Sequence, residues 1–168
     1  MNLQFYLEKL HDSENFKKFM KENPEAYLCS GFFIIDKEGK DNKQHFDFFI
    51  PEKKETFSFQ LEDNCKEIKL DTLDERIPEK VLLSDDVEFE YLEKLIVGEM
   101  FEQKINNKIQ KILLSLQRLN GKDFLVGTVF ISGLGILKVS IDIAEKKIID
   151  FEKKSFFDMM KFKGKKKE

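Results

Sequence analysis

The chain has 168 residues, of which 41% are hydrophobic and 36% are charged, and its formal net charge is −3. This composition excludes general disorder, and the charge gives no global case for a nucleic-acid binder. Phenylalanine occurs 18 times and tryptophan not at all, so phenyl rings are expected to build the core. No apolar run reaches the ~18 residues needed to cross a bilayer, and the N-terminus MNLQFYLEKLHD lacks the apolar stretch of a signal peptide.

The beginning of the chain predicts helix. Apolar residues recur at helical spacing through residues 3–11 and again through residues 14–22. Ser13 lies between these stretches, either as the N-cap of a second helix or inside one long helix. Asn23-Pro24 ends the helical region, because the residue before a proline avoids the α conformation.

Residues 26–62 predict three β-strands, around which the rest of the chain is organised. Apolar side chains occupy every second position, as in a strand with one face toward a core and the other toward water. Residues 37–42 and 51–54 contain the residue types that form turns. A fourth, short strand is expected at residues 66–70, and the short connections make these strands antiparallel.

Residues 71–84 show little periodicity and are expected to form a solvated, acidic connector. The wider segment 62–93 contains twelve acidic residues and only four basic ones. Acids in the first turn of a helix oppose the positive end of its dipole, so a following helix explains part of this charge.

A further helix is expected from about residue 86 to residue 104, with Ser84 or Asp85 as its N-cap. Gly98 costs this helix roughly 1 kcal/mol relative to alanine, which suggests close packing at that position. Four more strands follow, and Asn120-Gly121 between the first two is the strongest hairpin signal of the chain. Their expected positions are residues 112–117, 124–131, 137–143 and 147–151.

The two parts of the chain repeat one order, helix and then four strands. Gly39-Lys40-Asp41 and Gly121-Lys122-Asp123 fall at equivalent turns, 82 residues apart. The shared order indicates an internal duplication. The expected divisions are an N-terminal half at residues 1–70, the acidic connector at 71–84, a C-terminal half at 85–160 and a basic, disordered tail at 161–168.

Two stretches of the first half, NPEAYLCSGFFIID and KQHFDFFIPEKKETFSF, resemble uncharacterised archaeal proteins related to PepSY domains. The stretch KILLSLQRLNGKDFLVGTVFISGLGILKVSIDIAEKKIIDF resembles a further PepSY-type unit, and its end matches the usual final hairpin. The resemblance covers residues 13–152 and implies a cystatin-like fold, in which a curved antiparallel sheet wraps a helix. It therefore implies an α+β protein of two tandem helix-plus-four-stranded antiparallel halves. The wider family is implicated in protein binding, and the resemblance supplies no catalytic residues.

No residue pattern in the sequence points to catalysis, so we predict that the protein is not an enzyme and holds no cofactor or metal. His11 and His45 are the only histidines, and a metal site would need more donors than one histidine and scattered carboxylates. Cys29 and Cys65 are expected to be reduced structural thiols of a cytoplasmic protein, with a disulfide between them as the alternative. Cysteine–histidine catalysis would need a third, orienting group, which no local signature supplies.

A candidate partner surface is expected on the sheet of the first half. Phe49 alternates with Phe48 and Ile50, which places it among the polar side chains of the wet face. The strand at 26–36 is apolar on both faces, so either a second layer covers one face or that face binds a partner. We predict that the partner surface consists of Tyr27, Phe33, Ile35 and Phe49.

These observations predict a non-catalytic, cytoplasmic module that binds another protein or a second copy of itself. The alternative from a different class is an adaptor whose basic tail contacts nucleic acid or an anionic membrane surface. The five lysines of that tail are Lys161, Lys163, Lys165, Lys166 and Lys167.

Overall fold

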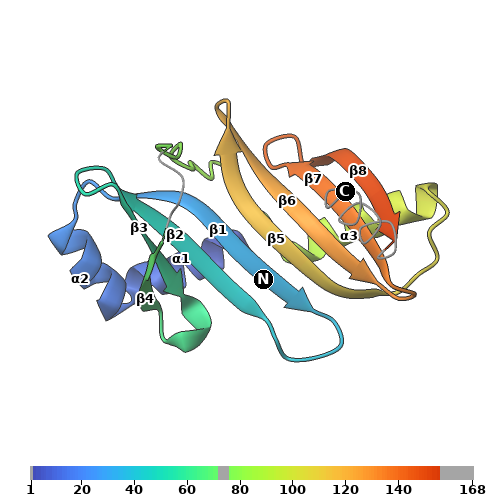
Figure 1. Ribbon diagram of the computed structural model, residues 1–168, viewed down its shortest axis with the longest axis horizontal. Coiled ribbons are helices and arrows are strands. Elements are labelled where there is room, and N and C mark those ends of the chain that lie inside the picture. The colour runs from blue at the N-terminus through green and yellow to red at the C-terminus, as the bar shows by residue number, and fades with distance from the viewer. Residues whose placement is uncertain (1, 72–75, 156–168) are drawn as a thin grey trace, which may run out of the picture.

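The computed structural model describes residues 2–71 and 76–155, here called the first half and the second half. Within them, three helices cover one face of a single eight-stranded antiparallel sheet, and Figure 1 shows α1 and α3 passing behind the strands. The elements are α1 (Leu3–Asp12), α2 (Glu14–Glu22), β1 (Tyr27–Asp36), β2 (Lys43–Ile50), β3 (Glu55–Gln60), the 3₁₀ turn η1 (Leu61–Asp63), β4 (Lys66–Leu70), α3 (Phe89–Glu102), β5 (Ile109–Leu119), β6 (Lys122–Ile131), β7 (Gly135–Asp142) and β8 (Lys147–Ser155). The predicted α+β class and antiparallel strands are confirmed.

The sheet runs in the order β4-β3-β2-β1-β5-β6-β7-β8, so it passes without interruption from one half to the other. The join is the antiparallel pair of β1 and β5, the first strand of each half. Phe33 lies opposite Leu114 near the middle of this pair. The separate sheets expected for the two halves are therefore one sheet, because each first strand uses its second edge to pair with the other.

Two side-chain N-caps determine where the helices at the start of the chain begin. The Asn2 side chain accepts a hydrogen bond from the Phe5 amide (2.8 Å) and begins α1. The Ser13 hydroxyl accepts one from the Phe16 amide (3.2 Å), and Ser13 has an extended backbone between α1 and α2. The residues 3–22 thus form two helices, because Ser13 acts as the N-cap of the second.

The core of the first half consists largely of phenyl rings, as predicted. Phe16 and Phe19 of α2 lie over Phe48 of β2 and Phe59 of β3. The ring centroids of Phe16 and Phe48 are 4.9 Å apart, and those of Phe19 and Phe59 are 5.0 Å apart, both in edge-on arrangements. Such aromatic pairs add to the free energy gained from burial alone.

The core of the second half is aliphatic, and α3 is the helix that covers it. Leu92, Ile96 and Met100 form the buried stripe of α3. Gly98 lies on its exposed side, where an added Cβ would meet nothing within 4 Å, so the close packing suggested for Gly98 is absent. The buried strand residues beneath include Ile112, Leu114, Leu116, Leu125, Val129, Leu137, Val139 and Ile141.

The described part of the connector is largely exposed, and backbone hydrogen bonds anchor it and the segment that follows it to the folded chain. The Val81 amide donates to the Leu28 carbonyl (2.9 Å), and the Leu3 amide donates to the Val87 carbonyl (3.0 Å). Val81 and Val87 are both buried in the core. The backbone near Val87 thus holds the start of α1, and α3 begins at Phe89, later than the predicted caps at Ser84 or Asp85.

An irregularity in β1 changes which of its side chains share a face. The pairing of β1 with β2 shifts register between Leu28 and Ser30, which is the signature of a β-bulge. Leu28 therefore lies on the helix-covered face together with Phe33 and Ile35, and these three belong to the core or pack against it. The uninterrupted alternation assumed from the sequence fails at this bulge.

Candidate interaction surface on the open face of the sheet

The four residues predicted as a partner surface do not form one surface. Phe33 is 1% exposed on the helix-covered face, 5.4 Å from the Phe46 ring, and Ile35 packs against the same core. Phe49 points to the opposite face but is only 6% exposed. The Tyr27 ring lies 5.6 Å from it, and the Tyr27 hydroxyl donates to the Pro78 carbonyl of the connector (2.7 Å).

This grouping was wrong because of the bulge at Cys29 and the position of the connector. The extra residue moves Phe33 and Ile35 to the face opposite Phe49. Pro78, brought back along the sheet by the connector, lies against Tyr27 and closes that end of the face. An exposed partner surface must therefore be sought elsewhere on the sheet.

The face of the sheet that carries no described helix is turned toward the viewer in Figure 1. The strand register places an apolar region at its centre. On it, Ile34 of β1 lies opposite Leu113 of β5, while Phe32 and Val126 lie on either side of Ser115. Val126 is 36% exposed and the other members are half-buried. We call this set the open-face patch; its members are Phe32, Ile34, Leu113, Phe124, Val126 and Phe130.

Hydroxyl and amide groups are interleaved with the open-face patch. Ser115 and Gln117 of β5, Thr128 of β6 and Ser140 of β7 point to the same face. In the described ranges these side chains form no hydrogen bond with one another or with other protein groups. They are therefore available to donate and accept hydrogen bonds at the surface.

Several ionisable groups next to the patch interact with other groups of the chain. The Ser30 hydroxyl donates to Asp47 Oδ2 (2.6 Å), and His45 Nε2 lies 2.5 Å from Glu62 Oε1. Burial by itself would raise the pKa of Glu62, but the hydrogen bonds from His45 and from backbone amides outweigh it and lower the pKa. These side chains on the border of the patch are thus engaged within the chain, whereas Lys138, opposite Thr128, forms no ion pair in the described residues.

The buried thiol of Cys29 is poorly suited to nucleophilic chemistry. Burial raises the pKa of Cys29 to about 12, and a nearby carboxylate, Asp47, acts in the same direction. Its thiol donates to the Asp47 carbonyl (3.4 Å). Cys29 and Cys65 are both buried and free, so the disulfide alternative is not present.

The described residues place no metal-type cluster near the patch. No group of three or more histidine, cysteine, aspartate or glutamate side chains within residues 2–71 and 76–155 could hold a metal ion. None of the helices in these ranges is long and apolar enough to cross a membrane.

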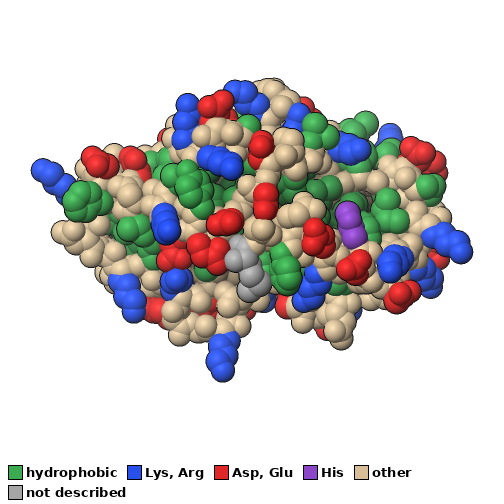
Figure 2. Space-filling model, turned by 180° about the vertical axis from the view of Figure 1, so that it is seen from behind, with side chains coloured by type: hydrophobic (Ala, Val, Ile, Leu, Met, Phe, Trp, Pro, Cys, Tyr) green, Lys and Arg blue, Asp and Glu red, His purple; other side chains and the backbone are tan. Residues whose placement is uncertain are grey.

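On the helix-covered face, acidic and basic side chains lie beside one another (Figure 2). The five lysines predicted as a basic tail lie outside the described residues.

Comparison with known proteins finds a similarity in fold. No protein-family model matches the chain, and no curated protein matches it. A crystal structure of a putative lipoprotein from Clostridium difficile 630 is similar, with a TM-score of 0.54 and 13% sequence identity. The similarity covers 84% of this chain and 91% of that one. At this identity the likeness concerns the arrangement of helices and strands alone.

Proposed function

We propose that the protein is a non-catalytic module that binds another protein on the open face of its sheet. The observation that carries this proposal is the open-face patch, in which six apolar side chains remain half-buried or exposed at the centre of the sheet. Exposed apolar residues grouped in this way are typical of interaction sites, whereas scattered ones are ordinary.

The chemistry of the patch favours a neutral, apolar polypeptide segment as its partner. Apolar side chains of the partner would be buried against Phe32, Leu113 and Val126. The unpaired groups of Ser115, Gln117 and Thr128 can bond to the partner's amide and carbonyl groups. A nucleic acid or an anionic membrane would need clustered lysine or arginine side chains instead. The lysines beside the patch, Lys43, Lys111 and Lys138, lie on three separate strands, and Lys43 and Lys111 are each paired with Asp41.

A charge placed in the patch tests this proposal. Val126→Lys puts an ammonium group where the partner's apolar surface would lie, so we expect partner affinity to fall at least tenfold. Val97→Lys is the matched control, because Val97 is 49% exposed on α3, on the other side of the sheet. A partner identified from cells with the unchanged protein would be purified and titrated against all three proteins by calorimetry. Equal affinities for the three would overturn the proposal.

The other possible occupants give different results in the same experiment. A second copy of the chain would appear as a dimer in size-exclusion chromatography with light scattering, and Val126→Lys would convert it to monomer. Contact of the basic tail with nucleic acid or membrane would be lost on deletion of residues 161–168 and would weaken steeply with salt. Either result would replace the patch-bound partner protein as the function.

We further propose that the protein consists of two tandem PepSY-like units and works in the cytoplasm. Each half has helix followed by four antiparallel strands, and the strand order is symmetric about the β1–β5 pair, which supports a duplication. Separate expression of the halves tests it, since a duplicated unit should form a dimer through the strand corresponding to β1 or β5. Cell fractionation with an antibody against the chain tests the location.

A further inference from the structure

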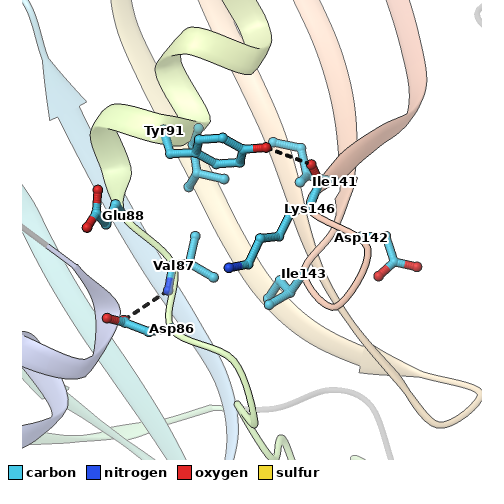
Figure 3. Close-up of a pocket in the computed structure, with 9 residues that line it drawn as sticks. Asp86, Val87, Glu88, Tyr91, Ile141, Asp142, Ile143 and Lys146 are labelled. Atoms are coloured by element: carbon cyan, nitrogen blue, oxygen red, sulfur yellow. Dashed lines mark hydrogen bonds between the residues drawn. The ribbon is translucent and has the colours of Figure 1, made fainter.

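A hollow of about 350 Å³ lies on the helix-covered side of the second half, away from the open-face patch. It opens between the start of α3 and the turn that joins β7 to β8, and Figure 3 shows it in close-up. Its volume falls within the range of small-molecule sites. The lining residues are Asp86, Val87, Glu88, Tyr91, Leu92, Ile141, Asp142, Ile143 and Lys146.

The walls of the hollow are apolar and firmly packed. Val87, Leu92, Ile141 and Ile143 are each at most 6% exposed and belong to the main core. The Tyr91 ring stands at the mouth, and its hydroxyl donates to the Lys146 carbonyl (3.3 Å), which ties α3 to the β7–β8 turn. The hollow is therefore preformed and needs no opening to admit an apolar group.

The acidic side chains around the hollow are turned away from it. Figure 3 shows the carboxylates of Asp86, Glu88 and Asp142 pointing outward from the cavity. Asp86 accepts hydrogen bonds from the Asn2 side chain (2.7 Å) and the Val87 amide (2.9 Å). Asp142 is 4% exposed and accepts one from the Glu145 amide (3.1 Å). Both carboxylates are thus engaged by donors of the chain.

Lys146 differs from the acidic lining residues in the direction of its side chain. Its amine points into the space between Val87 and Ile143 in Figure 3. Within the described ranges it forms no ion pair, unlike Lys37, Lys69 and Lys111, which each lie within 3.3 Å of a carboxylate oxygen. The hollow therefore combines apolar walls with one cation that points into it, while the three carboxylates around its rim point away from it.

We propose that this hollow is a binding site for an apolar monocarboxylate. The carboxylate would pair with the Lys146 amine, and the apolar body would lie against Val87, Leu92, Ile143 and the Tyr91 ring. The same chemistry is offered by a free aromatic or branched carboxylic acid and by the C-terminal residue of a peptide. The site is separate from the partner surface proposed above, because the residues that would contact the ligand lie on or beneath α3 and in the β7–β8 turn, on the helix-covered side of the sheet.

The test is a titration of the whole chain with 4-phenylbutyrate, followed by nitrogen–proton NMR spectra. We expect a Kd on the order of 0.1–1 mM for so small a ligand, with shifts concentrated at the amides of Val87, Tyr91 and Ile143. The uncharged analogue 4-phenylbutanamide should bind at least tenfold more weakly, because it cannot pair with the amine. Equal binding of acid and amide, or shifts elsewhere on the chain, would overturn the proposal.

Lysine variants make the test specific. Lys146→Met and Lys146→Gln should each weaken 4-phenylbutyrate binding at least tenfold, and melting curves would verify that both fold. Lys54→Met is the matched control, because Lys54 and Lys146 share a backbone φ of 52° in hairpin turns and only Lys146 faces the hollow. Unchanged affinity in both Lys146 variants would overturn the site. Val126→Lys should leave this affinity unchanged, so the two proposals can fail separately.

The source of the carboxylate is decided by a second pair of probes. A short peptide that is acetylated at its N-terminus and ends in phenylalanine with a free carboxylate would be compared with the same peptide amidated at its C-terminus. Tighter binding of the free-acid peptide than of 4-phenylbutyrate would identify a peptide C-terminus as the ligand. Weaker binding of that peptide than of 4-phenylbutyrate would identify a free acid.

Discussion

The first half of the molecule covers four strands with two helices and builds its core from phenyl rings, whereas the second half covers four strands with one helix and an aliphatic core. In the first half, Phe16 and Phe19 on α2 reach the rings of the sheet. The second half has only α3, together with the connector backbone around Val87. The hollow lies beside the start of α3.

The difference shows that four antiparallel strands can be packed against helices through either an aromatic or an aliphatic core. Large rings span the distance between helix and sheet with few side chains, and each ring contributes much of the buried area. Branched aliphatic side chains are smaller, so each one buries less apolar area and contributes less to the free energy of folding. The two halves should therefore respond differently to truncation of a single core residue.

The largest expected effect is the truncation of a core ring in the first half. Phe59 is fully buried and contacts the rings of Phe16, Phe19 and Phe48. Phe59→Ala should lower the free energy of unfolding by about 3–5 kcal/mol. Val129→Ala, at an equally buried site of the second half, should cost about 2 kcal/mol. Urea unfolding of both variants would measure this, and equal losses would contradict the distinction between the cores.

A second truncation tests the closed end of the open face. Phe49 is 6% exposed beside Tyr27, so Phe49→Ala should cost about 3 kcal/mol of stability. Tyr27→Phe, which removes only the hydrogen bond to the Pro78 carbonyl, should cost about 1 kcal/mol. Thermal melts would compare the two. A melting temperature unchanged by Phe49→Ala would show that Phe49 is accessible and would make it a partner contact again.

The outcome at Phe49 depends on features that periodicity cannot reveal. The alternation of Phe46 and Phe48 in β2, and of Leu137 and Val139 in β7, predicted their buried face correctly, because a period of two depends only on local strand geometry. The bulge at Cys29 inserts one residue without any composition signal, and it inverts the faces assigned around it.

Long-range pairing limited the prediction in the same way. Nothing in the local sequence of β1 indicates that its second edge pairs with β5, more than seventy residues away. That pair creates the centre of the open-face patch, since Phe32 and Ile34 meet Ser115 and Leu113 only across it. The hollow also joins α3 to the β7–β8 turn, so Lys146 gave no signal in the sequence.

Substitution of two glycines of the second half should change stability by smaller amounts and in opposite directions. Gly98 is exposed in α3 and has open space where an alanine Cβ would lie, so Gly98→Ala should raise stability by about 1 kcal/mol through helix propensity. In Gly127→Ala of β6 the new Cβ would lie 2.7 Å from Val139 Cγ2, so this change should destabilise. Urea unfolding would give both signs. A loss of stability in Gly98→Ala would reveal a packing role for the outer side of α3.

The smallest effect concerns a titratable pair of the first half. The pKa of Glu62 is lowered from its ordinary value of 4.5 by the hydrogen bonds from His45 and the backbone. A carboxyl group whose pKa is lower in the folded chain stabilises it above the unfolded pKa, and this contribution is lost as the pH falls through the folded pKa. Glu62→Gln should therefore lower stability at pH 7 by less than about 1 kcal/mol.

The same variant should lose its effect in acid. Below pH 4.5 the difference between Glu62→Gln and the unchanged chain should shrink, because Glu62 becomes protonated in both folded and unfolded chains. Glu67→Gln is the matched control, since Glu67 is exposed on β4 and should show little change at either pH. Melting curves from about pH 3 to pH 7 would follow the difference. A difference that persists undiminished in acid would mean that Glu62 acts through packing of η1 against β2 rather than through its charge.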